Sequence, residues 1–318
     1  MKSLKSINHA LCQVPSPLAG LALAIASLGL CWESIVMTQG IAQILGAILA
    51  SLILIPLCLK FIFNPSLLKQ ELQHPVAGSV LPTLTMATMV VANAVAHSFL
   101  TIGQAISWLA IIVQLCFFVA FVFYRCTHFN VKQILPSWFI PPIGLALAIV
   151  THPGGLPSIL NDLILAFGLI SYAILLPIVL YRLVFLGALD NNQKPIIAIL
   201  ATPASLLIVA YLASTAQPHF LLLMTLLIIA ILMTLYVYIA LINLLRLPFS
   251  PTYSAFTFPL VVGAIALYKS TQLLLKEGVE TQWISFISQL ANIELIIATV
   301  MVIYVSFRFI KHYYPTQH

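Results

Sequence analysis

Hydroxyl side chains inside apolar stretches are the residues of this sequence whose types and spacing could do chemistry. They occupy three stretches that are long enough for a helix, and each of these stretches also contains a proline. The hydroxyl residues are Thr83, Thr85, Thr88, Ser205, Ser254 and Thr257. A hydroxyl donates one hydrogen bond and accepts two, so several together can replace part of the hydration shell of a small ion. In a helix such groups also bond to a carbonyl one turn earlier, and the sequence leaves both interpretations open.

The other reactive residue types show no pattern that predicts catalysis or metal binding. The five cysteines lack the spacing of metal ligands, and no two of the eight histidines are spaced as ligands on one helix. The HExxH, GxSxG and paired-carboxylate motifs do not occur. No basic face with interleaved aromatic residues indicates nucleic acid binding. We therefore expect no enzymatic activity, no metal, no cofactor and no nucleic acid partner.

Five prolines recur about every sixty residues within apolar stretches. Pro82, Pro141, Pro203 and Pro259 are 59, 62 and 56 residues apart, and Pro17 stands one period earlier. A fixed period marks a structural unit that packs against its copies. A proline frees a backbone carbonyl, which in a membrane is tolerated only where protein or a water-filled cavity satisfies it. The pattern predicts five broken inner helices around a central path, each followed by a less interrupted outer helix.

The residues directly before four of these prolines are candidates for a constriction. They are Leu81, Ile140, Thr202 and Phe258. A residue before proline is disfavoured in helical geometry, so we expect these side chains to leave the normal helix surface. An apolar ring at one depth of a path blocks ions because it offers no replacement for their hydration water. The residues alone therefore predict a hydrophobic constriction at these positions.

The composition requires a membrane protein. Of the 318 residues, 62% are hydrophobic and 6% are charged, and the mean hydropathy is +1.12, whereas a soluble domain has about 25% charged residues. A membrane-spanning helix needs about 20 apolar residues. Residues 1–318 are predicted to form one transmembrane domain, with spans at 16–33, 40–63, 77–97, 101–124, 134–151, 157–186, 195–214, 218–246, 252–275 and 282–310.

The charged residues predict the orientation. All but two of the 13 lysines and arginines lie near the termini or after the even spans, so we expect both termini in the cytoplasm and the chain in the plasma membrane. The fold class is therefore an all-α polytopic membrane protein of ten helices. They form five hairpins in a quasi-five-fold arrangement, and the odd helices line a central pore. Glu294, an acid well inside an even span, is interpreted as a structural link between helices or protomers.

Four segments of the chain carry a family resemblance. They are residues 15–23, 71–75, 135–139 and 251–267, the last with the sequence Phe-Thr-Phe-Pro around Phe258. These segments resemble the tellurite-resistance/dicarboxylate transporter family, which includes bacterial TehA and the slow-type anion channels of plants. The resemblance implies a homotrimer in which each protomer holds its own anion pore, lined by the odd helices and plugged by Phe258. Pro259 follows the phenylalanine, as in the plant channels.

The resemblance leaves the substrate open. Members of the family are described as anion channels, dicarboxylate carriers and sulfite or tellurite exporters. The inner spans contain no acid that could carry protons, so we predict a passive channel or channel-like exporter of small anions. The alternative is a proton-coupled transporter of C4-dicarboxylates, sulfite or tellurite, which needs a titratable group on the path.

Overall fold

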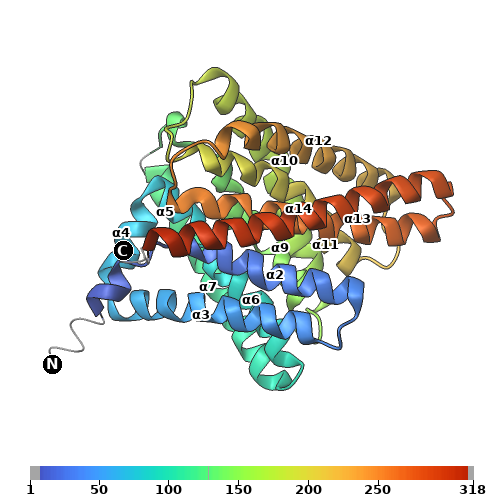
Figure 1. The fold of residues 1–318 in the computed structure, drawn as a ribbon, viewed down its shortest axis with the longest axis horizontal. Coiled ribbons are helices and arrows are strands. Elements are labelled where there is room, and N and C mark those ends of the chain that lie inside the picture. The colour runs from blue at the N-terminus through green and yellow to red at the C-terminus, as the bar shows by residue number, and fades with distance from the viewer. Residues whose placement is uncertain (1–7, 128, 314–318) are drawn as a thin grey trace.

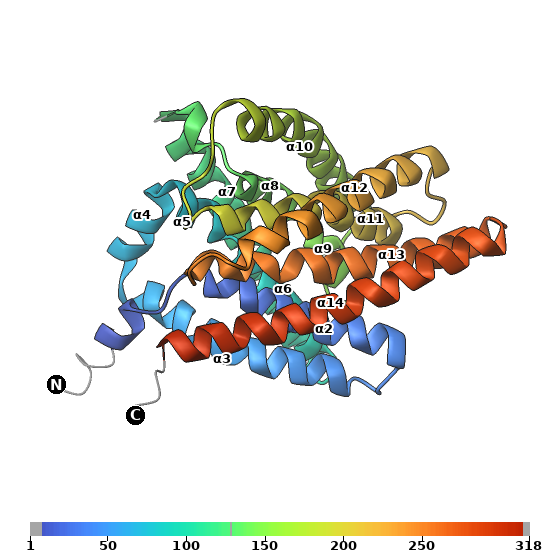
Figure 2. The same ribbon diagram turned by 45° about the horizontal axis from the view of Figure 1, so that its top comes forward.

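The computed structural model describes residues 8–127 and 129–313, and no strand occurs in this part of the chain. The helices form one bundle, in which α2 (Leu18–Val36) and α14 (Thr281–Tyr313) run along the long axis of the molecule (Figure 1). The start of α2 and the end of α14 lie at the same end of the bundle (Figure 2). Among the described residues, nine helical stretches are long and apolar enough to cross a membrane. The predicted all-α membrane fold is confirmed.

Five long helices make up the outer part of the bundle. They are α3 (Ile41–Phe63), α7 (Leu100–Thr127), α10 (Ser158–Phe185), α12 (Phe220–Leu244) and α14. Only 22–39% of the residues in their most apolar stretches are buried. Large apolar side chains such as Leu52, Leu109 and Ile303 are 65%, 62% and 64% exposed. Helices that expose this much apolar surface face lipid.

The inner part of the bundle consists of segments that begin or break at prolines. They are α2, α5 (Pro75–Val80) with α6 (Thr83–Ala96), η2 (Pro136–Phe139) with α8 (Ile140–Ile143) and α9 (Ala146–Thr151), η3 (Lys194–Ala201) with α11 (Thr202–Ser214), and η4 (Pro251–Phe256) with α13 (Phe258–Lys276). In the four of these segments that are long enough to span, 50–83% of the residues are buried. The division into inner and outer segments therefore follows the proline repeat.

The residues before the prolines do not leave helical geometry, so that expectation is wrong. Leu81 has φ −51° and ψ −36°, Ile140 has φ −63° and ψ −48°, and Thr202 has φ −74° and ψ −49°, all of them right-handed helical. At Pro141, Pro203 and Pro259 the proline lies in the first turn of an α-helix that follows a 3₁₀ segment. The first turn of an α-helix has no acceptor within that helix for its backbone N–H groups, so a proline there costs no hydrogen bond of the α-helix.

The fifth predicted span, residues 134–151, is not one helix but the three short segments η2, α8 and α9. The breaks leave carbonyl groups without helical partners, and side chains of neighbouring helices bind them. Gln114 donates to the carbonyl of Pro141 over 3.2 Å, and Asn93 donates to the carbonyl of Thr151 over 2.8 Å. A broken segment at membrane depth is stable because protein, and not lipid, surrounds it.

A buried lysine holds the start of the first inner helix. Lys60, near the end of α3, is 2% exposed. Its ammonium group donates to the carbonyl of Val14 over 2.8 Å, to Ser16 over 3.0 Å and to the Glu71 carboxylate over 2.6 Å. Ser16 also donates to Glu71. The three contacts use all three donors of the ammonium group, which fixes the chain just before α2.

A basic residue makes an equivalent contact in three other helix pairs. In each pair it lies near the end of the outer helix and contacts the chain near the start of the inner helix. The contacts are Arg125 to the carbonyl of Gln73, Arg182 to the carbonyl of Lys132 at 3.2 Å, and the Arg308 guanidinium to the Tyr253 ring at 5.3 Å. These basic residues therefore join the two helices of a pair at one end of the bundle.

Lys60→Met should lower the free energy of unfolding by about 3 kcal/mol, because it leaves the Glu71 carboxylate without its cation in a mostly buried place. Thermal or denaturant unfolding in detergent measures the change. Lys69→Met, at an exposed position of the connection that contains α4 (Pro65–Gln73), is the matched control and should change little. Equal stability of the two variants would contradict a structural role for Lys60.

Candidate functional site

A narrow cavity lies at the centre of the inner segments, and all five of them contribute to its wall. Its free volume is about 50 Å³, enough for a few water molecules. Most of the wall is apolar. The large side chains around it include Leu23, Met86, Phe139, Ile140, Ile199 and Phe258. The segments that share the proline repeat therefore enclose a single central space.

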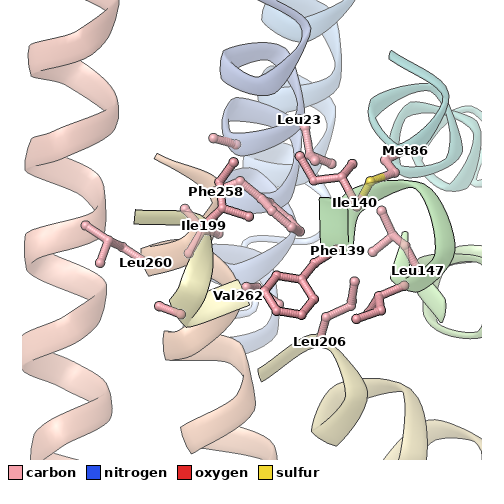
Figure 3. Packing of buried hydrophobic residues seen from close by; sticks show 14 of the residues in the cluster. Leu23, Met86, Phe139, Ile140, Leu147, Ile199, Leu206, Phe258, Leu260 and Val262 are labelled. Carbon is pink, nitrogen blue, oxygen red and sulfur yellow. The ribbon is translucent and has the colours of Figure 1, made fainter. Parts of the chain in front are cut away.

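Phe258 is the first residue of α13 and is 6% exposed. Its side chain converges with Leu23, Ile140 and Phe139, which come from other inner segments (Figure 3). Leu260, two residues later, points the other way, toward a neighbouring helix (Figure 3). Residues two apart lie on opposite sides of an α-helix, so the position of Phe258 directs its ring to the cavity.

Some of the predicted kink prolines and constriction residues lie together at the cavity. Those that line it are Pro17, Pro203, Pro259, Ile140, Thr202 and Phe258. Three others do not line it, namely Pro82, Pro141 and Leu81. Leu81 is 1% exposed and packs in the hydrophobic core. The five segments therefore do not contribute equivalent residues to the cavity wall.

Most of the candidate hydroxyl groups are already bonded to the backbone. Thr85, Thr88 and Thr257 do not line the cavity and lie within 2.6–2.8 Å of carbonyls of the preceding turn, and the Thr85 hydroxyl shares its one proton between such a carbonyl and Gln114 Oε1. Ser205 donates to the carbonyl of Ala201 over 3.0 Å and lines a different cavity.

Only some of the hydroxyl-bearing residues line the central cavity. Thr83 and Ser254 line it, although Thr83 also donates to the carbonyl of Val80 over 2.8 Å. Thr202 lines the cavity as well, and its buried hydroxyl has no hydrogen-bond partner among the described residues. Thr202 therefore has a hydrogen-bonding group that the protein leaves unused.

The cavity wall contains no charged side chain among the residues that the structure describes. An ion that entered it would lose hydration water and find few replacement ligands, which makes the observed cavity a barrier. The first turns of α11 and α13 both lie at the wall, at Thr202 and Phe258. Helix N-termini carry a partial positive charge.

Sequence reasoning missed two residues that support this site. Gln114, fully buried on the outer helix α7, binds both Thr85 and the carbonyl of Pro141. A Cβ atom at Gly144 would lie 2.6 Å from the Ile140 carbonyl oxygen and 2.8 Å from Gln114, so only glycine fits there. The available signal was a lone glutamine in the middle of an apolar span.

The fold defines a multi-pass membrane protein whose inner segments surround a central cavity. Residues 14–310 match the family described as voltage-dependent anion channel, and the chain belongs to this family of anion channels and transporters. This is the family that the sequence resemblance indicated.

Two relatives are proteins of Methanocaldococcus jannaschii, each named as an uncharacterized transporter. The first is 26% identical over 260 residues, which cover 70% of this chain and 73% of the relative. The second is 27% identical over 234 residues, which cover 64% of this chain and 67% of the relative. Their names agree with a transport function.

Proposed function

We propose that the protein is a passive channel or channel-like exporter for small anions, and that the ring of Phe258 is its gate. One observation carries the proposal: five inner segments surround one narrow cavity, and the Phe258 side chain forms part of its wall. The family to which the chain belongs supports anions as the transported species. In this proposal the observed cavity is the closed pore.

In the proposed channel, several weak interactions along the cavity wall select anions, in place of one strongly charged site. The unpartnered hydroxyl of Thr202 and the hydroxyl of Ser254 are donors that can replace part of the hydration shell of an anion. The N-termini of α11 and α13 add partial positive charge without a lysine or arginine. A path without a strong binding charge releases the ion readily, which suits conduction down a gradient.

A proton-coupled carrier of dicarboxylates, sulfite or tellurite is less well supported. Such a carrier needs a group on the path that gains and loses a proton during transport. Neither an acid nor a histidine lies among the described residues of the cavity wall. Glu294 lines a separate cavity between α12, α13 and α14. The passive mechanism is therefore favoured.

The proposal includes the location and assembly of the protein. The distribution of lysine and arginine favours an orientation with both termini in the cytoplasm, and we place the protein in the plasma membrane. The fold is consistent with two termini on the same side of the membrane, because the start of α2 and the end of α14 lie at the same end of the bundle (Figure 2). The homotrimer with one pore in each protomer rests on the family resemblance.

Phe258→Ala should raise anion flux strongly, because it removes the ring that fills the path and leaves the helix backbone in place. The flux of chloride and nitrate into liposomes that contain the purified variant measures the effect. The stability cost should stay below the roughly 3–5 kcal/mol of a fully buried phenylalanine, since one side of the ring faces a cavity.

Phe256→Ala is the matched control for this variant. Phe256 lies two residues earlier, is fully buried and does not line the cavity. Its loss should cost roughly 3–5 kcal/mol of stability with no gain in flux per folded protein. If Phe258→Ala conducts at the wild-type level, or loses as much stability as Phe256→Ala, Phe258 is a packing residue and the gate lies elsewhere.

The orientation is tested by single cysteines in a background that lacks the native ones. Gln70, Asp190 and Ser158 are exposed and suit the substitution. Gln70→Cys and Asp190→Cys should react with an impermeant thiol reagent only from the cytoplasmic side, and Ser158→Cys only from outside. Labelling of Gln70→Cys in intact cells would overturn the orientation.

A further inference from the structure

A second cavity, which we call the lateral crevice, lies between the outer helices α12 and α14 and the inner helix α13. Its volume is about 320 Å³, within the range of about 300–1,000 Å³ that small-molecule sites occupy. Leu235, Phe286 and Ile293 belong to its wall and are 54%, 53% and 54% exposed. Because these side chains face lipid, the crevice opens toward the membrane interior.

Two residues that line this apolar space carry buried polar atoms without a partner. Glu294 is 5% exposed, and its Oε1 atom has no hydrogen-bond partner. The Tyr238 hydroxyl is likewise buried without a partner, and Thr234 also lines the crevice. Over the part of the chain that the structure describes, the one ion pair within 4.0 Å joins Lys60 to Glu71, so no cation accompanies Glu294.

The backbone of α13 leaves room for the Glu294 carboxyl group. A Cβ atom at Gly263 would lie 2.1 Å from Oε1 of Glu294, so a side chain at this position would displace the carboxyl group. The expected structural link through Glu294 is thus a packing contact with α13, in which Oε1 makes no hydrogen bond. A polar group placed in this way lacks the partner that membrane-embedded acids normally have.

We propose that the lateral crevice binds an amphiphilic amine from the membrane, with the ammonium group at Glu294 and the apolar tail against the aliphatic wall. Charge complementarity identifies the head group, because an ammonium ion brings both a positive charge and three hydrogen-bond donors to a lone carboxyl group. Tyr238 and Thr234 offer oxygen acceptors for the remaining donors. The walls that accept the tail include Leu227, Ile231, Leu267 and Leu290.

Photo-crosslinking in lipid nanodiscs tests this proposal. The probes are n-decylamine with a diazirine in its chain and the matching n-decanol, which has the same tail and a neutral head. The amine should label residues within 227–238 and 286–294 roughly tenfold more than the alcohol does, as expected for hydrogen bonds to a charged group. Excess unlabelled decylamine should compete with this labelling.

Glu294→Gln keeps the shape of the side chain and removes its ability to become a carboxylate, so it should reduce amine labelling of the crevice to the level of the alcohol. Ile303→Ala, at a lipid-exposed position of the same helix, is the matched control and should label like the wild type. If Glu294→Gln does not fold, the comparison of amine with alcohol on the wild-type protein still decides.

Equal labelling by the two probes would overturn the proposal and indicate that a lipid chain fills the crevice. Amine labelling spread over the lipid-facing helices would also overturn it. The absence of crevice labelling by either probe would do the same, and would indicate that a second copy of the chain covers the opening. These outcomes do not depend on whether the protein conducts anions, so this proposal and the proposed channel function can fail separately.

Discussion

Backbone carbonyl groups freed at proline breaks must find partners inside the protein, because lipid offers none. The inner segments break at membrane depth, and neighbouring helices supply the missing donors. The carbonyl groups of Pro141 and Thr151, bound by Gln114 and Asn93, are examples. An inner segment is therefore stable only when surrounded by its neighbours, and this requirement explains why continuous helices enclose it. The central cavity is the space that remains where five such segments meet.

The basic residues near the ends of outer helices have two roles. As charges in short connections, they favour one orientation in the membrane. As donors, Lys60, Arg125 and Arg182 bind carbonyl groups just before the inner segments begin. Both roles place the basic residue at the same end of the helix pair, so the residues whose charge favours one orientation also hold the start of the inner segments.

The sequence predicts the repeat better than it predicts what each side chain faces. The proline period separated inner from outer segments, because it depends only on spacing. Whether a hydroxyl faces the cavity depends on the rotation of its helix, about 100° per residue, which spacing does not determine. Thr85 and Ser205 consequently lie outside the wall of the central cavity, whereas Thr202 belongs to it. The breaks in residues 134–151 depend on Gln114 and Asn93, which lie in other spans.

The central claim is that anions cross passively through the space at Phe258. The most direct test is the reversal potential of current through the Phe258→Ala variant in planar bilayers, measured with a chloride gradient and with and without a pH gradient. The account predicts a reversal potential at the chloride equilibrium potential that the pH gradient does not move. A reversal potential that shifts with the pH gradient, or a variant that passes no current, would contradict it.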